Sequence, residues 1–139
     1  MIVVDASAWL NALAGPSAIA ESCRALLQAD DQWMAPGHMA TEILRTLRRL
    51  ESAGQLTPRD AQALVNLVAA TAVTYVGPEP SLLAEQWRLR HNVSAYDAAY
   101  VALSLRYGLP LVTLDLRLAR AAQSLGVEVR SVRRDGAVI

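Results

Sequence analysis

The sequence predicts an α/β fold with a central parallel sheet of about five strands flanked by helices. Short apolar segments alternate with helix-like segments along the chain, which is the order of strand–helix–strand units with right-handed crossovers. Two of the apolar segments, Ile2–Val4 and residues 110–114, are almost free of polar side chains, as strands covered on both faces are. We therefore expect these two strands to be central in the sheet.

The first half of the chain predicts two strands and four helices. The expected elements are a strand at 2–4, helices at 8–14 and 17–28, a strand at 32–35, a helix between Gly37 and Gly54, and a helix from Thr57. Gly15-Pro16 ends the first helix, and Thr57-Pro58-Arg59-Asp60 combines a cap, a proline at the first helical position and an acid in the first turn. Two helices without a strand between them predict a helical hairpin inserted after the second strand.

In the second half of the chain, predicted strands again alternate with predicted helices. The expected elements are a strand at 72–76, a helix from Pro80 to about Arg90, a helix at 95–107, a strand at 110–114, a helix at 116–125 and an edge strand at 127–132. Ser94 is suited to cap the helix at 95–107, and Gly108 follows its end. No repeat or linker is visible, so we expect a single domain over residues 1–139.

Composition narrows the class of protein. More than half of the 139 residues are hydrophobic, and the net charge is zero, with 13 Lys and Arg residues that are all arginine. A zero net charge argues against a basic protein that coats nucleic acid regardless of sequence. Cys23 is the only cysteine, which excludes an internal disulfide and a thiolate metal cluster. No segment reads as a secretion signal or a membrane span, so we expect a soluble cytoplasmic protein without a membrane partner.

Two aspartates follow the two most apolar strands. Asp5 comes directly after Ile2–Val4, and Asp115 comes directly after residues 110–114. Ligands of open α/β sheets bind at the carboxyl ends of the strands, so neighbouring central strands would bring the two carboxylates together. Each aspartate could instead cap the helix that follows it.

Asp97 and Glu42 are further acidic candidates. Asp97 lies in the first turn of an almost wholly apolar helix without a nearby Lys or Arg, although Ser94-x-x-Asp97 also has capping-box spacing. The apolar stripe of the helix after Gly37 places Glu42 towards the opposite face, where a solvated ion pair with Arg45 or Arg49 is an alternative.

Several carboxylates without a compensating lysine cannot all stay charged at close range unless a cation intervenes. Hard oxygen ligands suit Mg²⁺ or Mn²⁺. Such ions on acidic sites commonly serve phosphate chemistry, because they polarise a phosphoryl oxygen and lower the pKa of a bound water. The residues themselves therefore indicate divalent-metal-dependent phosphate chemistry.

Four segments resemble the PIN-domain ribonucleases, in particular the VapC toxins of bacterial toxin–antitoxin pairs, and together they span nearly the whole chain. They are Ile2-Val3-Val4-Asp5-Ala6-Ser7, Thr41-Glu42-Ile43-Leu44, residues 94–103 around Tyr96-Asp97-Ala98, and Leu111-Val112-Thr113-Leu114-Asp115. The resemblance implies a PIN-like parallel sheet and an acidic quartet of Asp5, Glu42, Asp97 and Asp115.

The resemblance also implies roles for these side chains. Asp5 and Asp97 would be the primary Mg²⁺ or Mn²⁺ ligands, and Glu42 and Asp115 would complete the site directly or through water. Ser7 and Thr113 could hydrogen-bond the carboxylates or the attacking water, although ordinary strand-end hydroxyls look the same in sequence. Arg45 and Arg49 could line an RNA path, but arginines on a helix more often form a solvated face.

The implied activity is endonucleolytic hydrolysis of RNA by metal-activated water, which leaves 5′-phosphate and 3′-hydroxyl ends. The implied partners are an RNA substrate, a VapB-type antitoxin that covers the acidic groove, and a second copy of the chain in a homodimer. Two alternatives stay open: a PIN-like partner-binding module without activity, and a receiver-like phospho-acceptor domain. The absence of lysine counts against the receiver, because that family relies on a lysine in its site.

Overall fold

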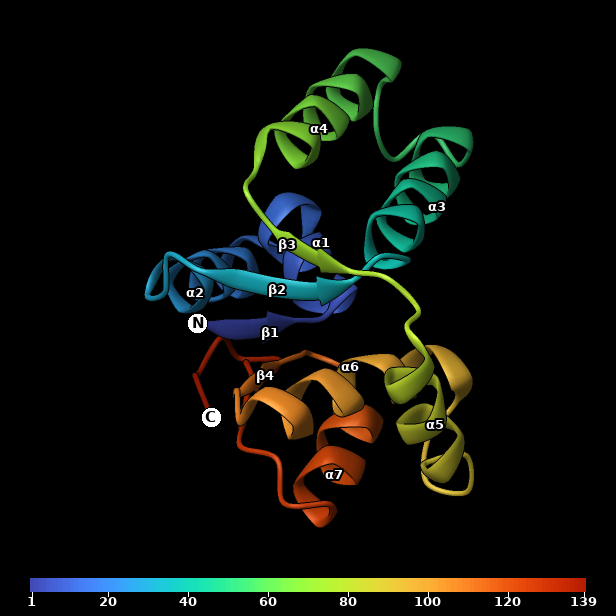
Figure 1. Ribbon diagram of the computed structural model, residues 1–139. Helices are drawn as coiled ribbons and strands as arrows, with labels where there is room; N and C mark the ends of the chain where they lie inside the picture. Colours follow the sequence, from blue (N-terminus) through green and yellow to red (C-terminus); the bar gives the residue numbers. More distant parts are fainter.

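The computed structural model describes residues 1–139 and consists of a five-stranded parallel sheet with seven helices (Figure 1). The strands lie in the order β3-β2-β1-β4-β5, so the predicted α/β class is confirmed. The strands are β1 (Ile2–Val4), β2 (Trp33–Pro36), β3 (Thr74–Val76), β4 (Leu111–Val112) and β5 (Val129–Arg130). The helices are α1 (Ala6–Ala14), α2 (Ser17–Gln28), α3 (Met39–Ser52), α4 (Pro58–Ala70), α5 (Pro80–Arg88), α6 (Ala95–Tyr107) and α7 (Leu116–Ser124).

The two most apolar segments are interior strands of the sheet, as predicted, and they are neighbours there. β1 is the middle strand and pairs in parallel with β2 on one side and with β4 on the other. Its three residues are 0% exposed. Pairing of Val4 with Val112 means that the chain leaves both strands at the same level of the sheet. The residues that follow β1 and β4 therefore emerge side by side.

Helices cover both faces of this sheet. Right-handed crossovers place α1 to α4 on one face and α5 to α7 on the other, and Figure 1 shows the two groups on either side of the strands. Helix α6 contacts β1, β2 and β4 and is buried over Ala98–Ser104. Its first turn consequently lies beside the carboxyl ends of the central strands.

Helices α3 and α4 follow each other without a strand between them, as expected after the second strand, and they project beyond the sheet in Figure 1. Other boundaries differ by a few residues from the sequence expectation. Helix α1 begins at Ala6 rather than at residue 8, because Asp5 already has the extended backbone of a residue before a helix. Strands β3, β4 and β5 are shorter than predicted, because their regular pairing covers only two or three residues.

Thr57 caps helix α4, and its replacement gives a first testable prediction. The Thr57 hydroxyl accepts a hydrogen bond of 3.1 Å from the backbone N–H of Asp60. Thr57→Ala should lower the free energy of unfolding by about 1 kcal/mol, because one backbone donor of the first helical turn loses its partner. Thermal unfolding checks this, with the exposed Ser52→Ala as the matched control. Equal melting temperatures for both variants would contradict the prediction.

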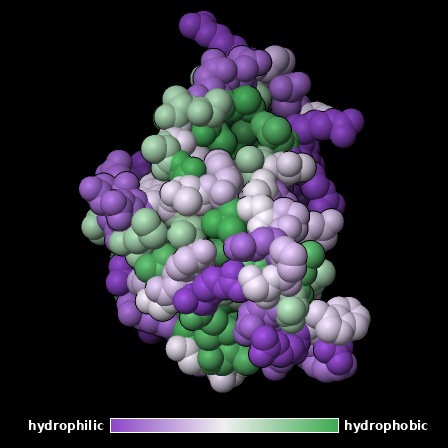
Figure 2. Space-filling model, in the orientation of Figure 1, coloured by the Kyte–Doolittle hydropathy of each residue, from purple (hydrophilic) through white to green (hydrophobic).

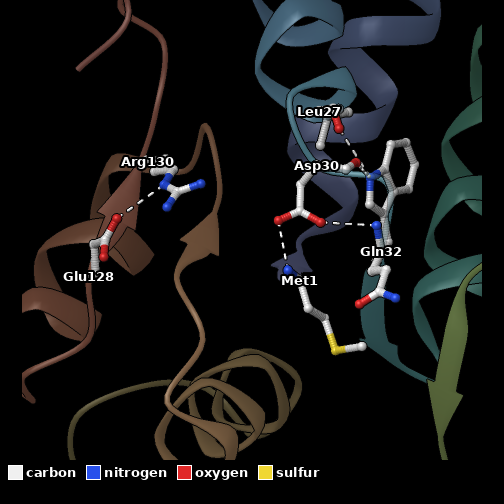
Figure 3. Close-up of polar contacts among 7 residues, drawn as sticks. Met1, Leu27, Asp30, Gln32, Glu128 and Arg130 are labelled. Atoms are coloured by element: carbon white, nitrogen blue, oxygen red, sulfur yellow. Dashed lines mark hydrogen bonds and ion pairs between the residues drawn. The ribbon is translucent and has the colours of Figure 1, made fainter.

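Asp30 secures the turn between α2 and β2 at the amino end of the sheet (Figure 3). Its carboxylate accepts hydrogen bonds from the Met1 ammonium at 2.7 Å and from the Gln32 backbone at 2.9 Å. The ammonium group and the backbone donor hold the pKa of Asp30 below its usual range. The Trp33 indole donates to the carbonyls of Leu27 and Asp30 in the same turn. These contacts lie at the opposite end of the strands from the candidate active site.

The surface alternates between hydrophobic and hydrophilic areas. Figure 2 shows hydrophobic atoms over the α3–α4 pair and again in the lower part of the view, where α6 and α7 lie in Figure 1. None of the helices combines the length and the apolar character needed to cross a membrane.

Candidate active site

Asp5 stands at the centre of the predicted acidic site. It is the first residue after β1, and its neighbour across the sheet is Thr113, the first residue after β4. The Thr113 hydroxyl donates to Asp5 Oδ2 at 2.7 Å, and the Ser7 hydroxyl donates to the same oxygen. Asp5 makes no capping hydrogen bond to helix α1, so the alternative of a simple helix cap is wrong for this residue.

The Asp5 carboxylate is buried without a cationic partner. Only 6% of the residue is exposed, and no ion pair includes it. Burial raises the pKa of Asp5, the hydroxyls of Ser7 and Thr113 lower it, and the negative charge of Asp97 raises it again. The ionised form is therefore disfavoured unless a cation arrives from outside the protein.

Glu42 lies close to Asp5, although the apolar stripe of its helix placed it towards the opposite face. The first turn of α3 begins next to the carboxyl end of β2, and Tyr100 of α6 donates a hydrogen bond of 2.8 Å to Glu42 Oε1. His38 Nε2 lies 3.3 Å from the same oxygen. Glu42 forms no ion pair with Arg45 or Arg49, so the alternative of a solvated Glu–Arg pair is wrong.

The pKa of Glu42 shows that the carboxylates share one environment. Burial is the largest effect and raises this pKa, whereas the Tyr100 hydroxyl and the charge of His38 lower it. The carboxylates of Asp5 and Asp97 raise it further. Three acids from β1, α3 and α6 thus act on one another electrostatically.

Asp97 lies half-buried in the first turn of α6. Its backbone N–H donates to the Ser94 hydroxyl at 3.2 Å, which confirms Ser94 as the cap of this helix. Burial raises the pKa of Asp97 and the nearby charge of Asp115 raises it as well, while Arg117 and His38 lower it. No ion pair neutralises the Asp97 side chain.

Asp115 does cap its helix, as its alternative interpretation allowed. Its Oδ1 accepts hydrogen bonds from the backbone of Arg117 at 2.9 Å and of Leu118 at 3.2 Å. Its charge nevertheless acts on Asp97, so all four predicted acids belong to one edge of the sheet. One carboxylate oxygen of Asp115 takes part in these capping bonds, and the other takes part in none of them.

Arg45 and Arg49 flank the acids on the exposed side of α3. Together with Glu42 and Thr46 they line a small cleft of about 210 Å³. Arg45 also borders a second cleft of about 350 Å³ with Glu42 and Asp97. The two arginines are therefore placed beside the acids without neutralising them.

Two side chains that contact Glu42, those of Tyr100 and His38, were not among the site residues predicted from the sequence. Tyr100 follows Asp97 by three residues and His38 precedes Glu42 by four, so helical spacing could have suggested both. The His38 ring packs edge-on against Tyr96 and Tyr100, with ring centroids 5.4 and 5.5 Å away.

The donor chemistry fits a hard divalent cation. Carboxylate oxygens dominate the site, and burial raises the pKa of three of the four acids. In this arrangement no group of three or more His, Cys, Asp or Glu side chains is gathered closely enough to hold an ion. Hydrogen bonds to Tyr100 and to the start of α7 occupy one oxygen each of Glu42 and Asp115.

A parallel α/β sheet with four acids at its carboxyl edge defines the class of protein. The PIN domain family model matches residues 2–124, and the chain belongs to this family. The match removes the support for a receiver-like domain.

The chain is similar to several named proteins, two of which are ribonucleases of one bacterium. The chain is 38% identical over 131 residues to ribonuclease VapC1 of Mycobacterium tuberculosis, covering 94% of this chain and 97% of the relative. It is 41% identical over 120 residues to ribonuclease VapC3 of the same organism, covering 86% of each. The fold resembles the crystal structure of M. tuberculosis VapC20, a toxin that cleaves the sarcin–ricin loop, with a TM-score of 0.67 at 22% identity, covering 87% and 95% of the two chains.

Proposed function

We propose that this protein is a metal-dependent endoribonuclease and the toxin of a type II toxin–antitoxin pair. The observation that carries the proposal is the group of partly buried carboxylates at the sheet edge of a PIN domain, centred on Asp5, which forms no ion pair. The high identity to proteins named ribonuclease VapC supports RNA as the substrate.

Asp5 and Asp97 are the proposed primary ligands of Mg²⁺, or of Mn²⁺ as a substitute, and Glu42 and Asp115 complete the site directly or through water. The bound ion would supply Lewis acidity and lower the pKa of a water molecule. Ser7 and Thr113 hold the Asp5 carboxylate in one orientation, and Tyr100 does the same for Glu42.

In the proposed reaction, water attacks the phosphorus in line with the bond to the 3′ oxygen. That bond breaks, the 3′ oxygen takes up a proton, and the products carry a 5′-phosphate and a 3′-hydroxyl. Arg45 and Arg49 lie beside Glu42 and are the proposed contacts for neighbouring phosphates of the RNA. Arginine suits this task because its guanidinium can bind phosphate through two parallel hydrogen bonds.

The proposal includes the partners and the place of action that the VapC resemblance implies. These are a VapB-type antitoxin that covers the acidic cleft, a homodimer, and the cytoplasm.

Cleavage of labelled RNA by the purified protein tests the function. Discrete products are expected with Mg²⁺ or Mn²⁺ and none with EDTA, and the chemistry of the product ends should be 5′-phosphate and 3′-hydroxyl. If the folded, antitoxin-free protein cleaves no RNA at any metal concentration, it is an inactive partner-binding module.

Tyr100→Phe gives a prediction on the pH dependence of cleavage. The Tyr100 hydroxyl lowers the pKa of Glu42, so its removal should raise that pKa further. A carboxylate binds a cation in its ionised form, so Glu42 can complete the proposed metal site only when it is ionised, and the acid limb of the pH–rate profile should move to higher pH. The relative loss of activity should consequently be larger at pH 6 than at pH 8. Tyr107→Phe, at the exposed end of the same helix, is the matched control and should leave the profile unchanged.

A further inference from the structure

We infer that the chain carries a nucleobase-binding pocket next to its acidic cleft, in which one unpaired base of the RNA lies between Tyr96 and Gln86. This inference rests on the proposed function. The pocket has a volume of about 340 Å³ and lies between the carboxyl ends of β2 and β3 and helices α5 and α6. Its lining includes Pro36, Val76, Leu82, Gln86, Tyr96 and Leu103.

The pocket adjoins the acidic cleft. His38 and Tyr96 line both, and Leu82 of α5 belongs to the pocket whereas Glu42 and Asp97 belong to the cleft. A nucleotide whose phosphate lies at the acids therefore has its base within reach of the apolar side. The two shared residues therefore favour part of the same RNA substrate as the occupant.

Tyr96 has the properties of a stacking residue. It is 66% exposed although it is large and aromatic, so packing of the protein core does not account for it. The His38 ring supports it edge-on at 5.4 Å, and His38 in turn packs against the buried Tyr100. An exposed aromatic ring held from behind can stack on any base, because every base has a π face.

Gln86 supplies polar recognition in a lining that is half hydrophobic. Its side chain is partly buried at the pocket and makes no hydrogen bond within the protein, so both its amide donor and its carbonyl acceptor are free. An amide of this kind pairs with a base edge that presents an adjacent donor and acceptor. Buried Leu82 and Leu103 form apolar walls.

Charge and size also favour a base. No acidic or arginine side chain lines the pocket, so it suits a neutral group better than a phosphate. Its volume is at the lower end of the range of about 300–1,000 Å³ for small-molecule sites, which suits one base rather than a larger group. RNA is generally recognised through such unpaired bases.

Abasic scanning combined with mutation tests the pocket. Once cleavage of total RNA has located a site, a short RNA with that site is made with an abasic nucleotide at each flanking position in turn. For the unmodified protein, we expect one position at which loss of the base lowers kcat/KM by about 5- to 150-fold. Tyr96→Ala should show the same loss on the intact RNA and no additional loss at that abasic position. Such non-additivity identifies a direct contact.

Two more variants complete the experiment. Gln86→Met keeps the approximate length of the side chain without its amide and should change which base is preferred at that same position. Tyr107→Ala, which removes an exposed tyrosine from the other end of α6, should behave as the unmodified protein. The pocket would be contradicted if Tyr96→Ala left cleavage unchanged, or if its effect simply added to the effect of every abasic position. Either result would leave the proposed ribonuclease activity standing. Absence of any cleavage by the unmodified protein would overturn both.

Discussion

Asp5→Asn is expected to reduce RNA cleavage by about 1,000-fold or more, because it removes the charge of a proposed primary metal ligand. The asparagine carbonyl can still accept the hydrogen bonds from Ser7 and Thr113. The substitution also removes a buried charge that has no cationic partner. The folded protein should therefore be at least as stable as the unmodified one at pH 7 without metal.

Single-turnover cleavage with Mg²⁺ measures the first effect, and thermal unfolding in EDTA measures the second. Asp31→Asn, at an exposed aspartate in the turn before β2, is the control and should change neither. A variant at Asp5 that lost activity only because it unfolded would contradict the assignment of Asp5 to the metal site. Full activity of a folded Asp5→Asn protein would contradict the same assignment.

Mn²⁺ should stabilise the unmodified protein, and Asp97→Asn should remove most of that stabilisation. An ion at one hundred times its dissociation constant adds about 2.7 kcal/mol to the free energy of unfolding, provided that it binds only the folded state. For a chain of this size that corresponds to a rise in melting temperature of about 5–10 °C. Thermal unfolding with and without Mn²⁺ at pH 7 measures the shift and needs no RNA.

Asp60→Asn is the matched control for this experiment, because Asp60 lies in the first turn of α4 rather than of α6. It should keep the full Mn²⁺-induced shift. An equal shift in Asp97→Asn and in the unmodified protein would mean that the ion binds elsewhere.

The metal-free protein should lose stability as the pH rises through the acidic range. Burial raises the pKa values of Asp5, Glu42 and Asp97 in the folded state, so the folded protein binds more protons than the unfolded chain. Their contribution to stability is fully present below the ordinary carboxyl pKa of about 4 and is lost as the pH rises through the raised values. Asp30, whose pKa is lowered, acts in the opposite direction at more acidic pH.

Chemical unfolding in EDTA between pH 4 and pH 7 measures this loss, and Mn²⁺ should offset it. Asp5→Asn should flatten the dependence, because the most buried of the three acids no longer titrates. An unchanged slope in this variant would assign the pH dependence to other groups.

The sequence by itself determined the order of the elements and the interior strands. Apolar runs such as Ile2–Val4 must be covered on both faces, and Thr57 and Ser94 act within their own helices, so these signals are local. The same signals placed Asp5 and Asp115 at the carboxyl ends of two central strands. They could not separate a helix cap from a buried carboxylate, because the two look identical in sequence.

Only the tertiary structure decided that question and gave Glu42 its surroundings. The buried Asp5 carboxylate accepts a hydrogen bond from Thr113, which lies 108 positions away, and does not cap its helix. Asp115 does cap its helix. Glu42 is tied to Tyr100 across 58 positions, against the face that its helical pattern suggested. The physical reason is that helical periodicity averages over the whole length of α3, whereas Glu42 lies in its first turn. There, the neighbours are supplied by β2 and α6.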